Sequence, residues 1–205
     1  MSRIDPNKTA LILIGFQRDY FDPEGILYSV VEESHRVSGT LANTINIIEA
    51  YKDSPMLMVN TPIVFSETYN ELNNPIGILK TIREVQAFKS GTTGAETIDE
   101  ITSFGDRILE VPGKRGFNAF SNTELDRILR ERGIETVLIA GCVTSICVNA
   151  TALQAFESGF DVMVLSDCTS GRTPIEQDFF CENVFPLFAR VCASEDILDQ
   201  SSAPA

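Results

Sequence analysis

Residues 136–148, TVLIAGCVTSICV, join an apolar run to a segment that can open a helix. The run Thr136–Ala140 has the length and composition of a strand buried on both faces, and Gly141 follows it directly. Open α/β sheets hold their ligands at the carboxyl ends of the strands. This stretch therefore predicts a parallel sheet and also the position of its functional site.

Similar apolar runs recur along the chain and alternate with segments of helical periodicity. Thr9–Ile14 (TALILI) predicts the first, central strand, and Leu41, Ile45 and Ile48 predict an amphipathic helix over residues 37–51. Further strands are expected at 56–60, 107–111, 161–165 and 189–193, and further helices at 123–132, at 144–158 and from Pro174 onward. Strands that alternate with helices predict an α/β fold with right-handed parallel crossovers.

The length and composition indicate one domain. At 205 residues and 43% hydrophobic, the chain can bury one full α/β core, so residues 1–205 are expected to form a single domain. Residues 65–105 are the least regular part, with turn signals at 73–75 and 90–94. We expect this excursion to cover the site or to contact a neighbouring subunit.

The charge and the apolar patterning exclude several partners. A formal charge of −13 without a basic run argues against nucleic acid. No apolar stretch approaches the roughly 20 residues that span a bilayer, and no signal peptide is recognisable, so a cytoplasmic location without a membrane partner is expected. The five cysteines are an odd number, which favours reduced thiols.

Cys147 is the leading candidate for a nucleophile. It lies just inside the start of the expected helix 144–158. A helix start carries partial positive charge and unpaired amide groups, which favour a thiolate and can receive a developing oxyanion. The alternative is a buried cysteine that acts only as a small hydrophobic residue.

A nucleophilic thiol needs a base or a nearby cation, because few thiols are ionised at neutral pH. The only histidine, His35, lies in the polar stretch EESHR and is expected on a solvent-exposed helix face. Lys114, in VPGKRGFNAF, follows the expected strand 107–111 and is the better partner, since a fixed ammonium can stabilise negative charge. The alternative is a surface lysine in a turn. No spacing of ligands predicts a metal site.

Four segments, in order along the chain, resemble motifs of the isochorismatase-like cysteine hydrolase superfamily. They are LIGFQRDYF at 13–21, KRGFNAFSNTEL at 114–125, GCVTSICV at 141–148 and SDC at 166–168. The resemblance implies a three-layer α-β-α fold with a six-stranded parallel sheet in the order 3-2-1-4-5-6. It places the site at the strand ends, in agreement with the pattern of apolar runs.

The resemblance also implies a chemistry that needs no cofactor. Cys147 would attack an amide-type carbonyl to give a thioester-type intermediate, and Lys114 would polarise the site. The backbone amides of Thr144 and Cys147 would form the oxyanion hole, with a cis bond between Val143 and Thr144. Water would then hydrolyse the adduct with the help of the family's catalytic aspartate.

Gly15 stands where that aspartate is expected, two residues before Gln17. Three explanations compete: a natural loss of the base, a deliberate substitution that inactivates the protein, or transfer of the role to another carboxylate. Asp19 is the nearest replacement in sequence. A chain without the base could also be a pseudoenzyme that binds a small molecule without turning it over.

The expected reaction class follows from the residues that differ among these hydrolases. Zinc-binding nicotinamidases carry an Asp and two His after the second strand, whereas this chain has NTPIVFSE at 60–67. Isochorismatases proper cleave a vinyl ether and generally lack the cysteine. Cys147 thus favours hydrolysis of a C–N bond in a small amide, ureide or carbamoyl compound, with vinyl ether hydrolysis or a redox role of Cys142 and Cys147 as alternatives.

Several further residues are expected around a small-molecule substrate. Arg172, and Arg115 in the lysine segment, can bind a carboxylate with a bidentate fork. The expected substrate contacts are Gln17, Phe21, Phe117, Val143 and Arg172. The resemblance also implies a homo-oligomer, a dimer or a tetramer.

Overall fold

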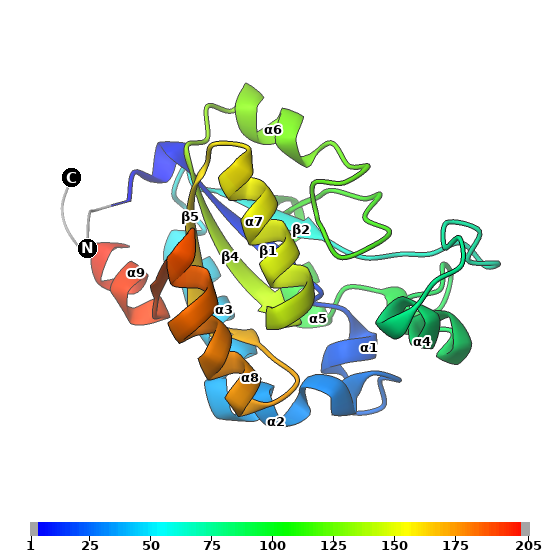
Figure 1. Cartoon of the computed structure of the whole chain (residues 1–205). Helices are drawn as coiled ribbons and strands as arrows, with labels where there is room; N and C mark the ends of the chain where they lie inside the picture. The colour runs from blue at the N-terminus through cyan, green and yellow to red at the C-terminus, as the bar shows by residue number, and fades with distance from the viewer. Residues whose placement is uncertain (1–3, 202–205) are drawn as a thin grey trace.

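A parallel sheet of six strands forms the centre of the computed structural model, which describes residues 4–201 (Figure 1). The order is β3-β2-β1-β4-β5-β6, and every pairing is parallel. The strands are β1 Thr9–Ile14, β2 Leu57–Thr61, β3 Leu109–Glu110, β4 Thr136–Cys142, β5 Asp161–Ser170 and β6 Arg190–Cys192. The α/β class and the strand order expected from the sequence are confirmed.

The central strand β1 is buried along its whole length. It pairs with β2 on one side and with β4 on the other. Its residues alternate between two hydrophobic cores: Leu11 and Leu13 belong to one, and Ala10, Ile12 and Ile14 to the other. A strand covered on both faces has no polar face, which explains why TALILI is apolar throughout.

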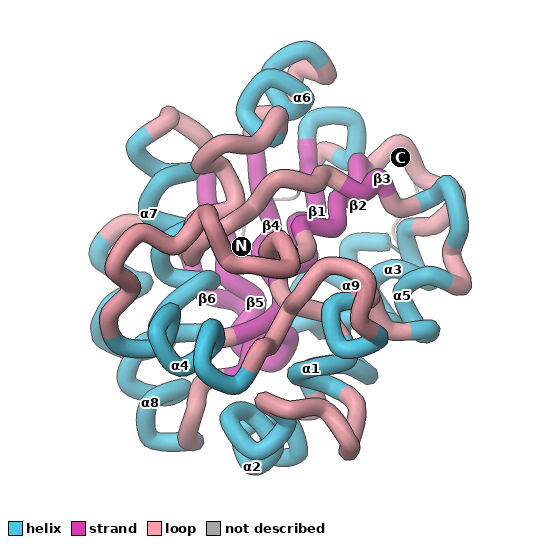
Figure 2. Tube along the Cα trace, turned by 90° about the vertical axis from the view of Figure 1, so that its right-hand side faces the viewer, coloured by secondary structure: helices cyan, strands magenta, loops and turns pink. Residues whose placement is uncertain are grey.

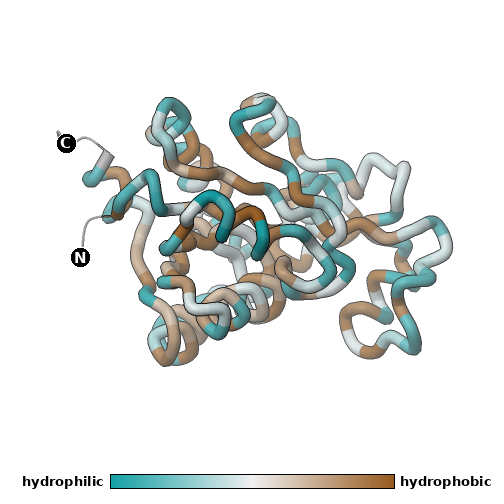
Figure 3. Tube along the Cα trace, turned by 90° about the horizontal axis from the view of Figure 1, so that it is seen from above, coloured by the Kyte–Doolittle hydropathy of each residue, from teal (hydrophilic) through white to brown (hydrophobic). Residues whose placement is uncertain are grey.

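Helices cover both faces of the sheet, so that the domain has three layers, with the strands inside and the helices around them (Figure 2). One core receives side chains of α2, α3 and α9, and the other receives side chains of α6 and α7. The helices are α1 Arg18–Phe21, α2 Tyr28–Ser38, α3 Thr40–Tyr51, α4 Gly77–Val85, α5 Asp99–Thr102, α6 Leu125–Glu131, α7 Asn149–Glu157, α8 Pro174–Phe179 and α9 Ser194–Ser201. Hydrophobic and hydrophilic stretches alternate along the trace (Figure 3), as this layering requires.

Some boundaries differ from the sequence-based expectation. The helix expected over 37–51 begins only at Thr40, as α3, because Gly39 before it has the left-handed φ of 69° and separates it from residues 37 and 38, which end the preceding helix α2. The strand expected at 107–111 is reduced to the two residues of β3, an edge strand with a partner on one side only. The segment 65–105 contains α4 and α5 and extends away from α9 (Figure 1).

The carboxyl ends of β1 and β4 leave no room for a side chain at position 141. Ile14 pairs with Gly141, and a Cβ atom on Gly141 would overlap the carbonyl group of Ile14. Gly141 also has a φ of 123°, which side chains disfavour. Glycine is therefore required here, because any other residue would displace the backbone of Ile14.

His35 does not lie on a solvent-exposed face as expected. Its ring is half-buried and meets the ring of Phe21 edge-on, with centroids 5.1 Å apart. Its Nδ1 atom is buried and has no hydrogen-bond partner among the described residues. Burial lowers the pKa of His35 from its usual value of 6.5, because the charged ring loses hydration.

This burial predicts a dependence of stability on pH. The unfolded chain takes up a proton near pH 6.5, whereas folded His35 resists it, so the free energy of unfolding falls as the pH drops through that value. We expect a loss of less than about 1 kcal/mol between pH 7.5 and 5.5, since the ring is half-exposed. Urea denaturation of the wild type and of His35→Gln at both pH values measures it. A variant with the same loss as the wild type would contradict this origin.

Candidate active site

Lys114 and Cys147 meet at the carboxyl edge of the sheet. The Nζ atom of Lys114 lies 3.6 Å from the Sγ atom of Cys147. The lysine is 1% exposed and the cysteine 6%, so that both functional groups are almost completely removed from bulk water. At low effective dielectric an ammonium group acts more strongly on a neighbouring sulfur than it would in water. Both residues were expected from the sequence to belong to the site, and the structure brings them together.

Cys147 is placed by the turn that follows β4. Residues Thr144–Val148 form a π-helical turn that leads directly into α7. The Val143 carbonyl accepts hydrogen bonds from the amides of Ile146 (3.0 Å) and Val148 (3.2 Å), which fixes the backbone around the cysteine. The cis peptide bond expected between Val143 and Thr144 lies one bond earlier, between Cys142 and Val143. β4 ends at Cys142, so the change of chain direction begins at that bond.

Lys114 is placed by a loop that follows β3 and is anchored at two points. Lys114 forms an isolated parallel β-bridge with Ile63, and the carbonyl of Lys114 accepts a hydrogen bond of 3.4 Å from the amide of Val64. Further along the loop, the amide of Ala119 donates to Oγ1 of Thr151 in α7 at 3.1 Å. The loop is thus tied to the extension of β2 and to the helix that carries Cys147.

Gly15 fits the backbone at this edge closely. It has a φ of 72°, and a Cβ atom on it would lie 2.8 Å from the carbonyl oxygen of Cys142 and 3.2 Å from its Sγ atom. Real Cβ atoms essentially never approach a backbone oxygen this closely. An aspartate at position 15 would therefore require the segment after β4 to move, which means that glycine is integrated into the local geometry.

The Asp19 carboxylate contacts the 88–94 segment in this structure. Its side chain is buried, and its Oδ2 atom accepts a hydrogen bond from the amide of Phe88 at 2.6 Å. Its other oxygen lies so close to Gly94 that a Cβ atom there would overlap it. The carboxylate thus holds the 88–94 segment against α1.

Gln17, expected to contact substrate, is used by the protein itself. Its Nε2 atom donates to the carbonyls of Ile63 (2.9 Å) and Ala95 (2.7 Å), and its Oε1 atom accepts from the amide of Ile63 at 2.8 Å. Both donor hydrogens of the amide are occupied. The side chain therefore connects three loops at the carboxyl edge.

The other three residues expected to contact substrate, Phe21, Val143 and Phe117, are distributed over the two hydrophobic cores. Phe21 stacks on Phe16 with centroids 5.0 Å apart and is part of one hydrophobic core, which also contains the fully buried Val143. Phe117 packs against the opposite core. Cys147 belongs to this second core, so Phe117 packs on the same side of the sheet as the cysteine, whereas Phe21 and Val143 belong to the other core.

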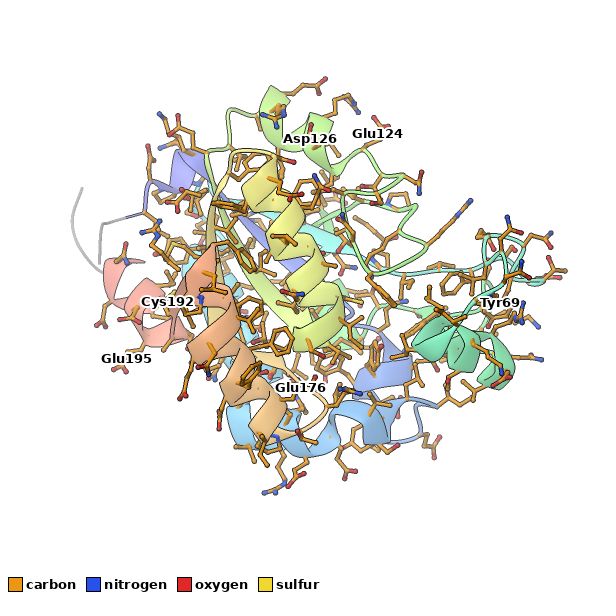
Figure 4. All side chains as sticks on the ribbon, in the orientation of Figure 1. Tyr69, Glu124, Asp126, Glu176, Cys192 and Glu195 are labelled. Atoms are coloured by element: carbon orange, nitrogen blue, oxygen red, sulfur yellow. The ribbon has the colours of Figure 1, made fainter. Side chains whose placement is uncertain are left out.

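Arg172 is exposed and pairs with a carboxylate of its own helix region. Its Nη2 atom lies 2.6 Å from Oε2 of Glu176, which projects from α8 (Figure 4). Oε1 of Glu176 also accepts a hydrogen bond of 2.5 Å from Ser145, two residues before Cys147. Arg172 is therefore connected to the turn Thr144–Val148 through Glu176. Arg115 also pairs with a carboxylate, since its Nε atom lies 3.8 Å from Oε1 of Glu71.

Gln177 is a site residue that sequence reasoning missed. It is 6% exposed, and its Oε1 atom accepts a hydrogen bond of 2.5 Å from Oγ1 of Thr144. Its Nε2 atom donates to the Ser166 carbonyl (2.8 Å) and to Oγ1 of Thr169 (2.9 Å), both in β5. A sequence signal was present, because Pro174 marks a helix start and places Gln177 in its first turn.

We expect Gln177→Ala to lower the free energy of unfolding by about 2–3 kcal/mol, because buried hydroxyl and carbonyl groups would lose their partners. Gln154→Ala, a half-buried glutamine on α7, serves as the matched control and should cost less than about 1 kcal/mol. Urea denaturation measures both values. Equal costs for the two variants would show that Gln177 does not hold the Thr144 turn.

Burial raises the pKa of Cys142 and of Cys168, and it raises the pKa of Cys181 to about 11 and that of Cys192 to about 12. All five cysteines are free.

Within residues 4–201, no group of three or more His, Cys, Asp or Glu side chains is arranged to hold a metal ion. No helix in the described part of the chain is long and apolar enough to cross a membrane.

Comparison with known proteins identifies the family. The model of the isochorismatase domain matches residues 9–196, so the chain belongs to the isochorismatase family, whose members are hydrolases. A cysteine hydrolase from Pseudomonas syringae pv. phaseolicola has the same fold, with a TM-score of 0.86 at 18% identity over 98% of this chain and 95% of that one.

Two similar structures have names that specify a substrate. N-carbamoylsarcosine amidase from Thermoplasma acidophilum has a TM-score of 0.71 at 25% identity, over 92% of this chain and 97% of that one. The pyrazinamidase of Pyrococcus horikoshii, in complex with zinc, has a TM-score of 0.73 at 26% identity, over 91% and 99%. Both are proteins to which this chain is similar.

Proposed function

We propose that this chain hydrolyses a C–N bond in a small amide, ureide or carbamoyl compound through a thioester on Cys147. The single observation that carries the proposal is the 3.6 Å contact between Lys114 Nζ and Cys147 Sγ, with both groups buried. A cysteine held only for packing has no need of a buried ammonium group beside it.

The residues around this pair have separate tasks in the proposal. The Cys147 sulfur attacks the carbonyl carbon, and the Lys114 ammonium stabilises negative charge on the sulfur before attack and as it is released. The amides of Thr144 and Cys147, in the turn after β4, receive the oxyanion. Gln177 supports this turn by its hydrogen bond to Thr144. Water then cleaves the thioester and frees the cysteine.

The substrate class has two supports. Cys147 supplies a nucleophile for acyl transfer, which favours a carbonyl compound over a vinyl ether. Two similar structures are named amidases, N-carbamoylsarcosine amidase and pyrazinamidase. No metal is required by the proposed chemistry, since the lysine provides the positive charge.

A second candidate function is favoured by Gly15 alone. Without a carboxylate at this position, the domain would bind a small molecule at the Lys114–Cys147 pair without releasing product. Gly15→Asp, which would put a carboxylate back at this position, is unsuitable as a test. Gly15 fits so closely against Cys142 that the substitution would also displace the backbone.

The test is amine or ammonia release from a panel of primary amides, ureides and N-carbamoyl amino acids. Cys147→Ala should abolish turnover of any compound the wild type cleaves, and Lys114→Met should lower kcat/KM by about 10²–10³. Cys192→Ala is the matched control, because Cys192 is also 6% exposed but lies on the edge strand β6, and it should keep the wild-type rate.

The outcomes separate the candidates. Turnover that survives Cys147→Ala would contradict the thioester route. Saturable binding of a panel member without product, in the wild type, would support the binding function instead. Cleavage of a vinyl ether such as isochorismate, with no amide cleaved, would favour the alternative hydrolase reaction.

A further inference from the structure

Helix α8 contacts the turn Thr144–Val148 with two neighbouring side chains. Oε1 of Glu176 accepts a hydrogen bond of 2.5 Å from Oγ of Ser145. Oε1 of Gln177 accepts one of 2.5 Å from Oγ1 of Thr144. Two consecutive residues of the helix thus hold two consecutive residues of the turn.

Two such contacts restrict the turn more than one does. Its internal hydrogen bonds, from the amides of Ile146 and Val148 to the Val143 carbonyl, maintain its shape. The side-chain bonds to α8 fix its position in the domain. A single bond leaves a segment free to rotate about that bond, whereas a second bond from the next residue removes this freedom. Glu176 therefore imposes an orientation on the turn that Gln177 alone does not.

The carboxylate of Glu176 is itself fixed. Its Oε2 atom accepts a hydrogen bond of 2.7 Å from Nε of Arg172 and lies 2.6 Å from Nη2 of the same residue. The Arg172 amide donates to Oε1 at 3.2 Å, and the Glu176 amide donates to Oγ1 of Thr173, which caps α8, at 3.1 Å. The guanidinium thus occupies Oε2 and leaves Oε1 for the hydroxyl of Ser145.

The contact between Glu176 and Ser145 is shielded from water. The side chain of Glu176 is 12% exposed, and Ser145 is half-buried. Burial alone would raise the pKa of Glu176, but hydrogen bonds from Arg172 and Ser145 outweigh it, so that the pKa lies below its usual value of 4.5. The carboxylate is therefore ionised at neutral pH, and a charge-assisted hydrogen bond is stronger than one between neutral groups.

We propose that Glu176 is a positioning residue, which fixes, through the Ser145 hydroxyl, the orientation of the turn whose amides receive the oxyanion. The proposal rests on the proposed function, because it assumes acyl transfer at Cys147. Ser145 stands between Thr144 and Cys147, so a rotation at this residue moves the two oxyanion amides relative to each other. Glu176 exchanges no proton with the substrate and acts only through the turn.

This role predicts a loss of rate without a loss of binding. Ser145→Ala and Glu176→Ala each remove the contact. Each should lower kcat for the best amide of the panel by about 10–100-fold, because misplaced donors stabilise the oxyanion less. KM should change by less than about twofold, since the amides act on charge that develops only in the transition state.

Two further variants test whether the contact itself is responsible. In Glu176→Gln the side-chain carbonyl can still accept from Ser145, so kcat should stay within about fivefold of the wild-type value. The double variant Ser145→Ala/Glu176→Ala should lose no more than either single variant, because both substitutions remove the same hydrogen bond. Losses that multiply would contradict the proposal.

Alkylation by iodoacetamide separates positioning from a general disruption of the site. This reaction uses the same Cys147 sulfur beside Lys114, but the attacked carbon is saturated, so no oxyanion forms. In Ser145→Ala and Glu176→Ala the rate of alkylation at Cys147 should remain within about twofold of the wild-type rate, because only oxyanion stabilisation is impaired. Peptide mass mapping over time measures it.

Asp126→Ala is the matched control. Asp126 also pairs with an arginine four residues away, Arg130, at 3.0 Å. It lies on α6, away from Glu176 (Figure 4). This variant should keep wild-type values of kcat, KM and the alkylation rate, since an exposed ion pair contributes little to stability.

Two results would overturn the role assigned to Glu176. One is a wild-type kcat in both Ser145→Ala and Glu176→Ala. The other is an equal loss of kcat and of the alkylation rate, which would show that the substitutions disrupt the site as a whole. Failure of the proposed function looks different: the wild type itself would cleave no amide of the panel, and that result would remove both proposals.

Discussion

The burial of the Lys114 ammonium is the constraint on which the site depends. An isolated charge in the protein interior is very costly, so a lysine that is 1% exposed needs a fixed environment that compensates for its lost hydration. Cys147, 3.6 Å away, can provide negative charge where the ammonium needs it. The anchoring of the lysine loop to Thr151 and of the Thr144 turn to Gln177 keeps the two groups at this distance.

The ends of β1 and β4 lie side by side at the carboxyl edge of the sheet, where the site is built. Gly141 pairs with Ile14, and the next residues along each strand are Cys142 and Gly15. The space between these strand ends is filled by Cys142 and by the ring of Tyr20, not by a carboxylate. The fit of Gly15 against Cys142 thus explains why glycine is accommodated at position 15.

Much of the fold could be predicted from the sequence, because buried parallel strands are continuous apolar runs and need no distant information. The break between α2 and α3 was missed, since helical periodicity continues across Gly39 while the backbone does not. Cys147 and Lys114 could be named because each follows an expected strand end. The uses of Gln17 and Asp19 could not, because their partners, Ile63, Ala95 and Phe88, lie in loops whose positions only the folded chain defines.

The most direct measurement is the site of alkylation when the folded protein reacts with iodoacetamide at less than one equivalent, located by peptide mass mapping. We expect Cys147 to react first, although it is almost fully buried, because Lys114 stabilises its negative charge. Exposure alone would favour Cys181, which is the least buried of the five thiols. Reaction at Cys181 before Cys147 would contradict the central claim that the buried lysine activates this cysteine.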